Sequence, residues 1–222
     1  MKIRAIILSA LILCGISAVI MYSRAAQPQQ KSSVITQAIN DKNTPMVIKN
    51  LILKMKEQME VNDDQFPELI KEVENYTNSC ADSASVAVLH SMLAEMYQNY
   101  FQRNQWTINQ RTQLSGYIPE DIRVWTSNLF TDKIKEEIDL SLRPTALLQN
   151  TPVSKFKDIL EIGKDSQNLR PSRYEFLAFR ALDIQPTVQI YKDLIAFQNK
   201  EPNMKSVLLT ELDYLRFLYG DK

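Results

Sequence analysis

The chain has 222 residues, of which 45% are hydrophobic and 23% charged, enough apolar material for one ordinary domain or two small ones. Its 26 basic residues balance its 26 acidic ones, and no run of lysines and arginines forms the basic patch that a nucleic-acid-binding protein requires. Glycine is scarce, and apolar residues do not alternate with polar ones, which argues against β-sheets.

Residues 1–25 have the three parts of a signal peptide. Lys2 and Arg4 precede an uncharged apolar run over residues 5–21, and the small residues Ser23 and Ala25 suit cleavage after Ala25. Cleavage would leave 23 basic against 26 acidic residues, a net charge of −3. The segment therefore predicts export to the periplasm or cell envelope.

Two alternatives to cleavage stay open. Residues 5–21 approach the length of a membrane span and could remain as an anchor. Cys14 could be lipidated, although Leu13 is larger than the residue usually found before a lipidated cysteine. In each case we expect contact with the membrane only through this export segment.

The remainder of the chain predicts an all-α protein built of irregular stacked helical hairpins. We expect a polar lead with a short helix over 26–43, a helical domain over 44–184 and a carboxy-terminal helical hairpin over 185–222. The hairpin is tetratricopeptide-like in its short connection, although no fixed repeat period is present. Apolar residues spaced three and four apart predict helices over 45–61, 66–77, 83–110, 127–142, 152–162, 172–184, 187–199 and 203–219.

Two of these helices carry a start signal in the sequence. Thr44 precedes Pro45, and Thr151 precedes Pro152. A capping hydroxyl followed by proline at the first helical position is typical of a helix amino terminus.

The last helix is apolar around more than half of its circumference. A single neighbouring helix covers only one side of such a surface, so we expect an exposed strip that serves as a protein-docking surface. Its predicted members are Val207, Leu208, Leu212, Leu215, Leu218 and Tyr219.

Candidate catalytic and metal-binding residues are few. His90, the only histidine, lies on an apolar face, which favours a hydrogen-bonded histidine between helices. Cys80 is the only cysteine beyond the export segment, so no intramolecular disulfide can form after cleavage. The acidic pairs 63–64, 120–121 and 136–137 are expected on solvated helix faces. We therefore predict no catalytic residue, no metal, no cofactor and no enzymatic activity.

Aromatic residues are concentrated between positions 97 and 125. They favour filling of gaps between helices and around an irregular connector, with a ligand-stacking surface as the alternative. The set comprises Tyr97, Tyr100, Phe101, Trp106, Tyr117 and Trp125.

Several blocks occur in the order found in a known family. They are 89–97 (LHSMLAEMY), 118–125 (IPEDIRVW), 156–160 (FKDIL), 169–178 (LRPSRYEFLA) and 190–197 (IYKDLIAF). Together they resemble the amino-terminal helical region of bacterial alpha-macroglobulin-like proteins. The likeness extends over about residues 40–219, nearly the whole chain after the export segment.

The resemblance implies an envelope protein that protects against foreign proteases, with a bait region and, in some members, a reactive thioester. The thioester motif Cys-Gly-Glu-Gln is absent, since the only Cys-Gly pair is Cys14-Gly15, and the β-sandwich domains of the family are also absent. What the resemblance implies is a non-catalytic binding or scaffolding module whose partner is a protein, either downstream domains of the same chain or an envelope partner. The alternative is a stand-alone envelope adaptor that binds a peptide or glycan, and an enzyme with an unfamiliar site is the third.

The export segment yields the first prediction. Amino-terminal sequencing of the exported protein should begin at Ala26, because Ser23 and Ala25 provide the small residues that signal peptidase requires. A product that retains Met1, or that begins at a lipidated Cys14, would contradict it.

Overall fold

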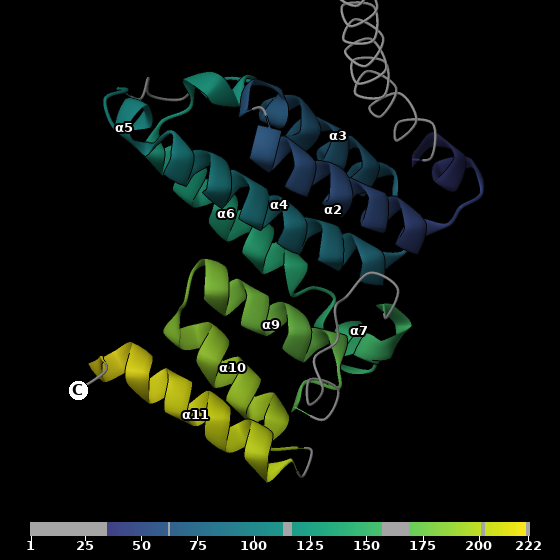
Figure 1. Ribbon diagram of the computed structural model, residues 1–222. Coiled ribbons are helices and arrows are strands. Elements are labelled where there is room, and N and C mark those ends of the chain that lie inside the picture. The colour runs from purple at the N-terminus through teal and green to yellow at the C-terminus, as the bar shows by residue number, and fades with distance from the viewer. Residues whose placement is uncertain (1–34, 62, 113–116, 157–168, 201–202, 221–222) are drawn as a thin grey trace, which may run out of the picture. The chain divides into compact units, whose positions relative to one another are not determined.

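The computed structural model describes residues 35–61, 63–112, 117–156, 169–200 and 203–220 (Figure 1). Every regular element within these ranges is a helix, and one isolated bridge joins Pro152 to Ser172. The predicted all-α class is confirmed. The signal peptide, the anchor and the lipidation site predicted in residues 1–25 lie outside the described residues, and the tetratricopeptide-like character of the hairpin stays a prediction.

The chain divides into two compact units, residues 1–54 and 55–222. In the first, a helical segment at 35–40 precedes α2 (Thr44–Val61), which continues into the second unit. The remaining α-helices are α3 (Phe66–Ser79), α4 (Ser83–Arg103), α5 (Gln105–Ile108), α6 (Ser127–Ser141), α7 (Thr145–Gln149), α9 (Arg173–Ile184), α10 (Val188–Gln198) and α11 (Met204–Tyr219). Three 3₁₀ turns, η1 (Asp63–Gln65), η2 (Ile122–Val124) and η3 (Val153–Phe156), complete the described elements.

The start of α2 is capped one residue earlier than predicted. The Asn43 side-chain carbonyl accepts a hydrogen bond from the backbone N–H of Met46 at 3.2 Å, while Thr44 is already helical. Lys42, with φ of 52°, lies in the left-handed region and turns the chain between the two helical segments. Asparagine caps a helix at least as well as threonine, which explains why Asn43 and not Thr44 caps α2.

Thr151 does not cap a helix either. Its hydroxyl donates to the carbonyl of Leu147 in the preceding turn at 2.7 Å. Pro152 pairs with Ser172, and the 3₁₀ turn begins only at Val153. The predicted helix over 152–162 is therefore a short turn in its described part, and the remainder lies outside the described residues.

The long helix predicted over 83–110 ends at Arg103. Asn104 interrupts it, with φ of −105° and ψ of 11°, and its side-chain amide donates to the Tyr100 carbonyl at 3.0 Å. Asparagine competes in this way for backbone groups and therefore favours helix ends. The chain continues as the short helix α5.

Within the second unit, α4 is the central helix and packs against α3, α6 and α9 (Figure 1). Polar contacts tie α9 to it. Arg180 donates to Ser91 at 2.9 Å and pairs with Glu95 at 2.6 Å, and the Gln98 amide donates to the Ile184 carbonyl at 2.7 Å. In turn, α9 packs against α7 and α10, and α10 packs against α11. The position of the carboxy-terminal helices therefore depends on α4.

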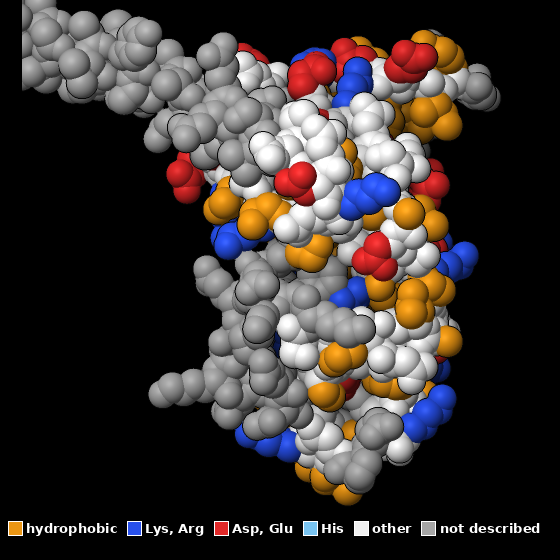
Figure 2. All heavy atoms as spheres, turned by 90° about the vertical axis from the view of Figure 1, so that its right-hand side faces the viewer, with side chains coloured by type: hydrophobic (Ala, Val, Ile, Leu, Met, Phe, Trp, Pro, Cys, Tyr) orange, Lys and Arg blue, Asp and Glu red, His pale blue; other side chains and the backbone are white. Residues whose placement is uncertain are grey.

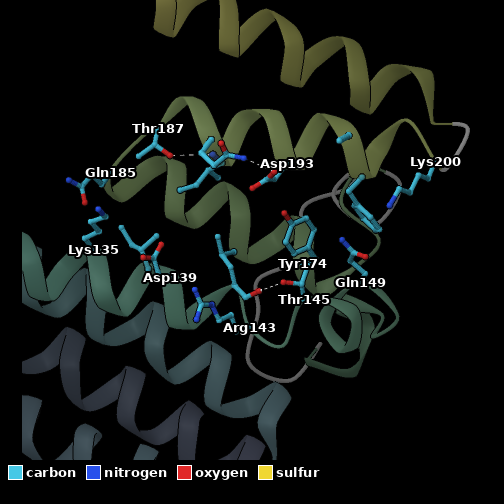
Figure 3. A pocket seen from close by; sticks show the side chains of 16 residues that line it. Lys135, Asp139, Arg143, Thr145, Gln149, Tyr174, Gln185, Thr187, Asp193 and Lys200 are labelled. Atoms are coloured by element: carbon cyan, nitrogen blue, oxygen red, sulfur yellow. Dashed lines mark hydrogen bonds between the residues drawn. The ribbon is translucent and has the colours of Figure 1, made fainter.

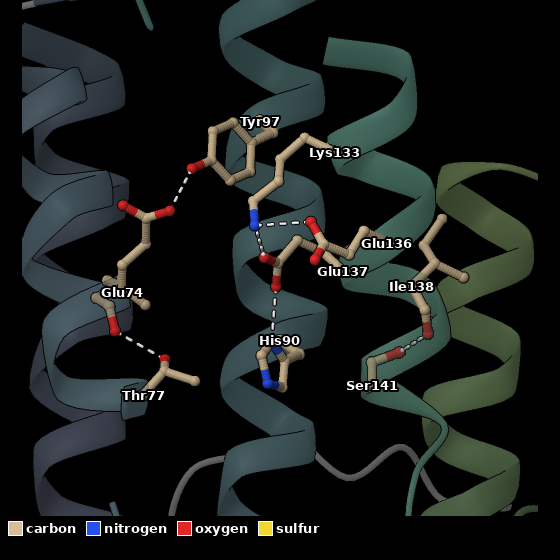
Figure 4. A network of polar contacts seen from close by, with 10 residues as sticks. Glu74, Thr77, His90, Tyr97, Lys133, Glu136, Glu137, Ile138 and Ser141 are labelled. Atoms are coloured by element: carbon tan, nitrogen blue, oxygen red, sulfur yellow. Dashed lines mark hydrogen bonds and ion pairs between the residues drawn. The ribbon is translucent and has the colours of Figure 1, made fainter. Parts of the chain in front are cut away.

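The interface between α4 and α6 has an aromatic centre. The ring of Tyr97 stacks on Trp125 with a centroid separation of 5.6 Å and an interplanar angle of 8°. Phe130 of α6 is fully buried and contacts both rings, at 6.5 and 5.3 Å. The Tyr97 hydroxyl donates to a Glu74 carboxylate oxygen of α3 at 2.6 Å, so this residue connects three elements (Figure 4).

The same interface contains a buried carboxylate that the sequence placed on a solvated face. Glu137 is only 2% exposed, and its two oxygens have different partners (Figure 4). One lies 2.6 Å from Nδ1 of His90, and the other 2.9 Å from Nζ of Lys133. The prediction of a hydrogen-bonded histidine between helices is confirmed, whereas the expectation for Glu137 was wrong. A buried carboxylate requires such partners: the contact with His90 crosses from α6 to α4, whereas Lys133 pairs with Glu137 within α6.

Tyr97 makes the stability of the fold depend on pH in the alkaline range. Burial, together with the hydrogen bond and negative charge of Glu74, raises the pKa of Tyr97 well above its ordinary value. The folded state thus keeps this proton when the unfolded chain has lost it, and stability falls as the pH rises above the unfolded pKa of about 10. At pH 11, loss of the Tyr97 proton in the unfolded chain should lower the free energy of unfolding by about 1.4 kcal/mol.

The prediction is that Tyr97→Phe loses less stability than wild type between pH 8 and pH 11 in urea denaturation. Tyr117→Phe is the matched control, because the ring of Tyr117 is 60% exposed in the fold. An equal loss in wild type and Tyr97→Phe would contradict this account of Tyr97.

Candidate functional site

The side of α11 that faces α10 is formed by small and aromatic residues. Val207 and Thr210 are buried, and the rings of Tyr214 and Phe217 contact Tyr191 of α10 at 5.2 and 5.4 Å. The helix begins after Asn203, whose side-chain carbonyl accepts a hydrogen bond from the backbone N–H of Ser206. Val207 was predicted in the docking surface, but it is 7% exposed and lies on this inner side, so that part of the prediction was wrong.

The opposite side of α11 is apolar and exposed. Leu208, Leu212, Leu215 and Tyr219 are 56, 44, 51 and 68% exposed on this side, and Leu218, 42% exposed, lies at its edge near the covered side. These five residues are called the α11 strip below. Their exposure, which the sequence predicted, is confirmed, and Leu209 and Met204 extend the apolar surface along its edges.

The spacing of side chains within the α11 strip indicates which shape of partner would fit it. Residues 208, 212, 215 and 219 follow one another at intervals of four, three and four, the spacing of a and d positions in a coiled coil. Side chains at this spacing form one narrow row along the helix. The complement of such a row is a second α-helix.

The aromatic segment divides into a buried part and an exposed part. Tyr97, Tyr100 and Trp125 are buried, and Phe101 packs against Phe130 at 5.7 Å, so these four fill space between helices as predicted. Trp106 and Tyr117 fill no such space. Trp106, on the short helix α5, is 78% exposed, and Tyr117, in the connector after it, is also exposed.

The remaining candidates form no reactive cluster. The thiol of half-buried Cys80 lies 4.0 Å from the Asp82 carbonyl, a weak contact. Within the described ranges, no three residues of the types His, Cys, Asp and Glu come together to hold a metal ion. In the same ranges, no helix has both the length and the apolar character for a membrane span.

The surface charge follows the composition. On the face in Figure 2, lysine and arginine side chains are scattered among acidic and apolar ones and form no continuous basic patch. Electrostatic binding of a polyanion needs several cations along one surface.

Comparison with known proteins gave no match to a family model, to a curated protein or to a solved structure. The α11 strip is therefore the candidate site on physical grounds alone.

The two sides of α11 should respond differently to the same substitution. We expect Leu215→Glu to change the unfolding free energy by no more than about 0.5 kcal/mol, since the side chain is exposed. Val207→Glu places a charge in a buried position and should destabilise by several kcal/mol. Urea denaturation of both variants is the measurement, and similar losses would contradict the orientation of α11.

Proposed function

We propose that this chain is a non-catalytic helical scaffolding module of an exported alpha-macroglobulin-like protein, and that the α11 strip is its protein-docking surface. The observation that carries the proposal is the exposed row of apolar side chains at coiled-coil spacing. The ordered blocks of sequence that resemble the amino-terminal region of that family supply the context.

The size of the apolar surface supports docking. Five residues of the α11 strip and their apolar neighbours, each about half exposed, present on the order of 400 Å² of apolar area. Patches of this size on a soluble protein often mark interaction sites. Covering them with a partner would stabilise the assembly through the hydrophobic effect.

The spacing favours one kind of partner, an amphipathic helix that lies along α11. In the proposed module this helix belongs to an adjoining domain of the alpha-macroglobulin-like protein. The module itself takes no part in trapping chemistry, because the chain contains no Cys-Gly-Glu-Gln motif.

Site-specific photo-cross-linking tests the proposal. With p-benzoylphenylalanine at Leu215, irradiation in the producing cell should link α11 to sequence from an alpha-macroglobulin-like domain. Leu208→Glu together with Leu212→Glu should remove this product while the fold remains, because both side chains are exposed.

The photoreactive residue at Lys192, exposed on α10, provides the control position and should give no such product. A cross-linked pair of copies of this chain, or the same product from both positions, would contradict the proposed function.

A further inference from the structure

A groove of about 800 Å³ lies in the second unit, between α6 and α7 on one side and α9 and α10 on the other (Figure 3). It shares Gln149 and Phe197 with a second hollow of about 530 Å³, which reaches Asn203 and Ser206 at the start of α11. The two hollows are therefore neighbours, and the larger one is called the groove below. Neither includes a residue of the α11 strip.

Tyr174 forms part of the floor of the groove. The residue is 4% exposed, and its ring meets Phe197 edge-on at 5.2 Å. Its hydroxyl makes no hydrogen bond within the described part of the chain and is accessible from the groove. Burial and the nearby Asp193 raise the pKa of Tyr174 to about 12, so the hydroxyl remains a donor at neutral pH. It is available to a ligand atom that accepts a hydrogen bond.

The walls of the groove carry three cations. Lys135 lies on α6, Arg143 follows the end of α6, and Lys200 lies beyond the end of α10 (Figure 3). Among the described residues, none of these three side chains makes a hydrogen bond or an ion pair. Asp139 is likewise unpaired there, whereas Asp193 accepts from Gln189 at 2.8 Å. In the larger hollow, three cations against two carboxylates favour an acidic ligand.

The polar lining suits an extended chain. Lys135 lies within α6 and Arg143 lies beyond its last residue, Ser141, so two acidic side chains of one peptide would meet cations at separate points of the wall. The side-chain amides of Gln149 and Gln185, which also line the groove, can each donate and accept, as peptide groups require.

We propose that this groove binds an extended peptide segment with acidic side chains, two of which pair with Lys135 and Arg143 while a backbone carbonyl accepts from the Tyr174 hydroxyl. A neutral glycan would leave the cations unpaired, so the charges favour the peptide. This site is separate from the α11 strip and does not depend on the proposed scaffolding function.

Three fluorescein-labelled dodecapeptides, (Glu-Ala)6, (Gln-Ala)6 and (Lys-Ala)6, test the proposal by fluorescence anisotropy with the full chain after the export segment. We expect (Glu-Ala)6 to bind at least tenfold more tightly than (Gln-Ala)6, and (Lys-Ala)6 to bind least. Lys135→Glu with Arg143→Glu should reverse the order of the acidic and basic peptides. Both positions are exposed, so the fold should tolerate the change.

Tyr174→Phe should weaken binding of both (Glu-Ala)6 and (Gln-Ala)6 by about fivefold, the effect of losing one hydrogen bond. Lys192→Glu with Lys205→Glu changes the net charge equally at exposed positions outside the groove and should preserve the order of peptides. The proposal is overturned if the three peptides bind equally or not at all. It is also overturned if the control variant reverses the order, or if chitohexaose binds in place of the peptides.

Discussion

The contact between α4 and α6 is the interaction on which the rest of the second unit depends. Tyr97 and Trp125 stack beside Phe130, and Glu137 links the two helices through His90. A buried carboxylate that lost one partner would cost several kcal/mol, so the two helices have little freedom to shift against each other. Because α4 also contacts α3 and α9, this contact determines where the later helices lie.

Helix α10 separates two surfaces of different character. One of its sides turns Tyr191 toward α11, and the other turns Asp193 and Phe197 into the groove. The inner side of α11 is occupied by α10, which leaves the α11 strip on the opposite side. An apolar row that suits a helix and a charged groove that suits an extended chain thus lie on different sides of one helical hairpin.

Local sequence patterns predicted the helices well, because apolar periodicity reflects burial along a single element. They failed where a residue's environment depends on a distant segment. Glu136 and Glu137 are adjacent and alike, yet only Glu137 meets His90, 47 positions away. In α11 the pattern identified an excess of apolar residues but did not show that Val207 is on the covered side. The groove has no local signature at all, because its walls come from helices far apart in the sequence.

The two tryptophans lie in opposite environments, and this gives the chain a built-in optical reporter. Trp125 is held by its stack with Tyr97 and by an indole N–H that donates to the Pro119 carbonyl at 2.7 Å, whereas Trp106 is 78% exposed. Emission from Trp106 is open to aqueous quenchers, and emission from Trp125 is shielded by the helix pair. Replacing Trp106 with phenylalanine would leave Trp125 as the single tryptophan, inside the α4–α6 contact. Its emission wavelength would then report whether the core is intact, without any added label.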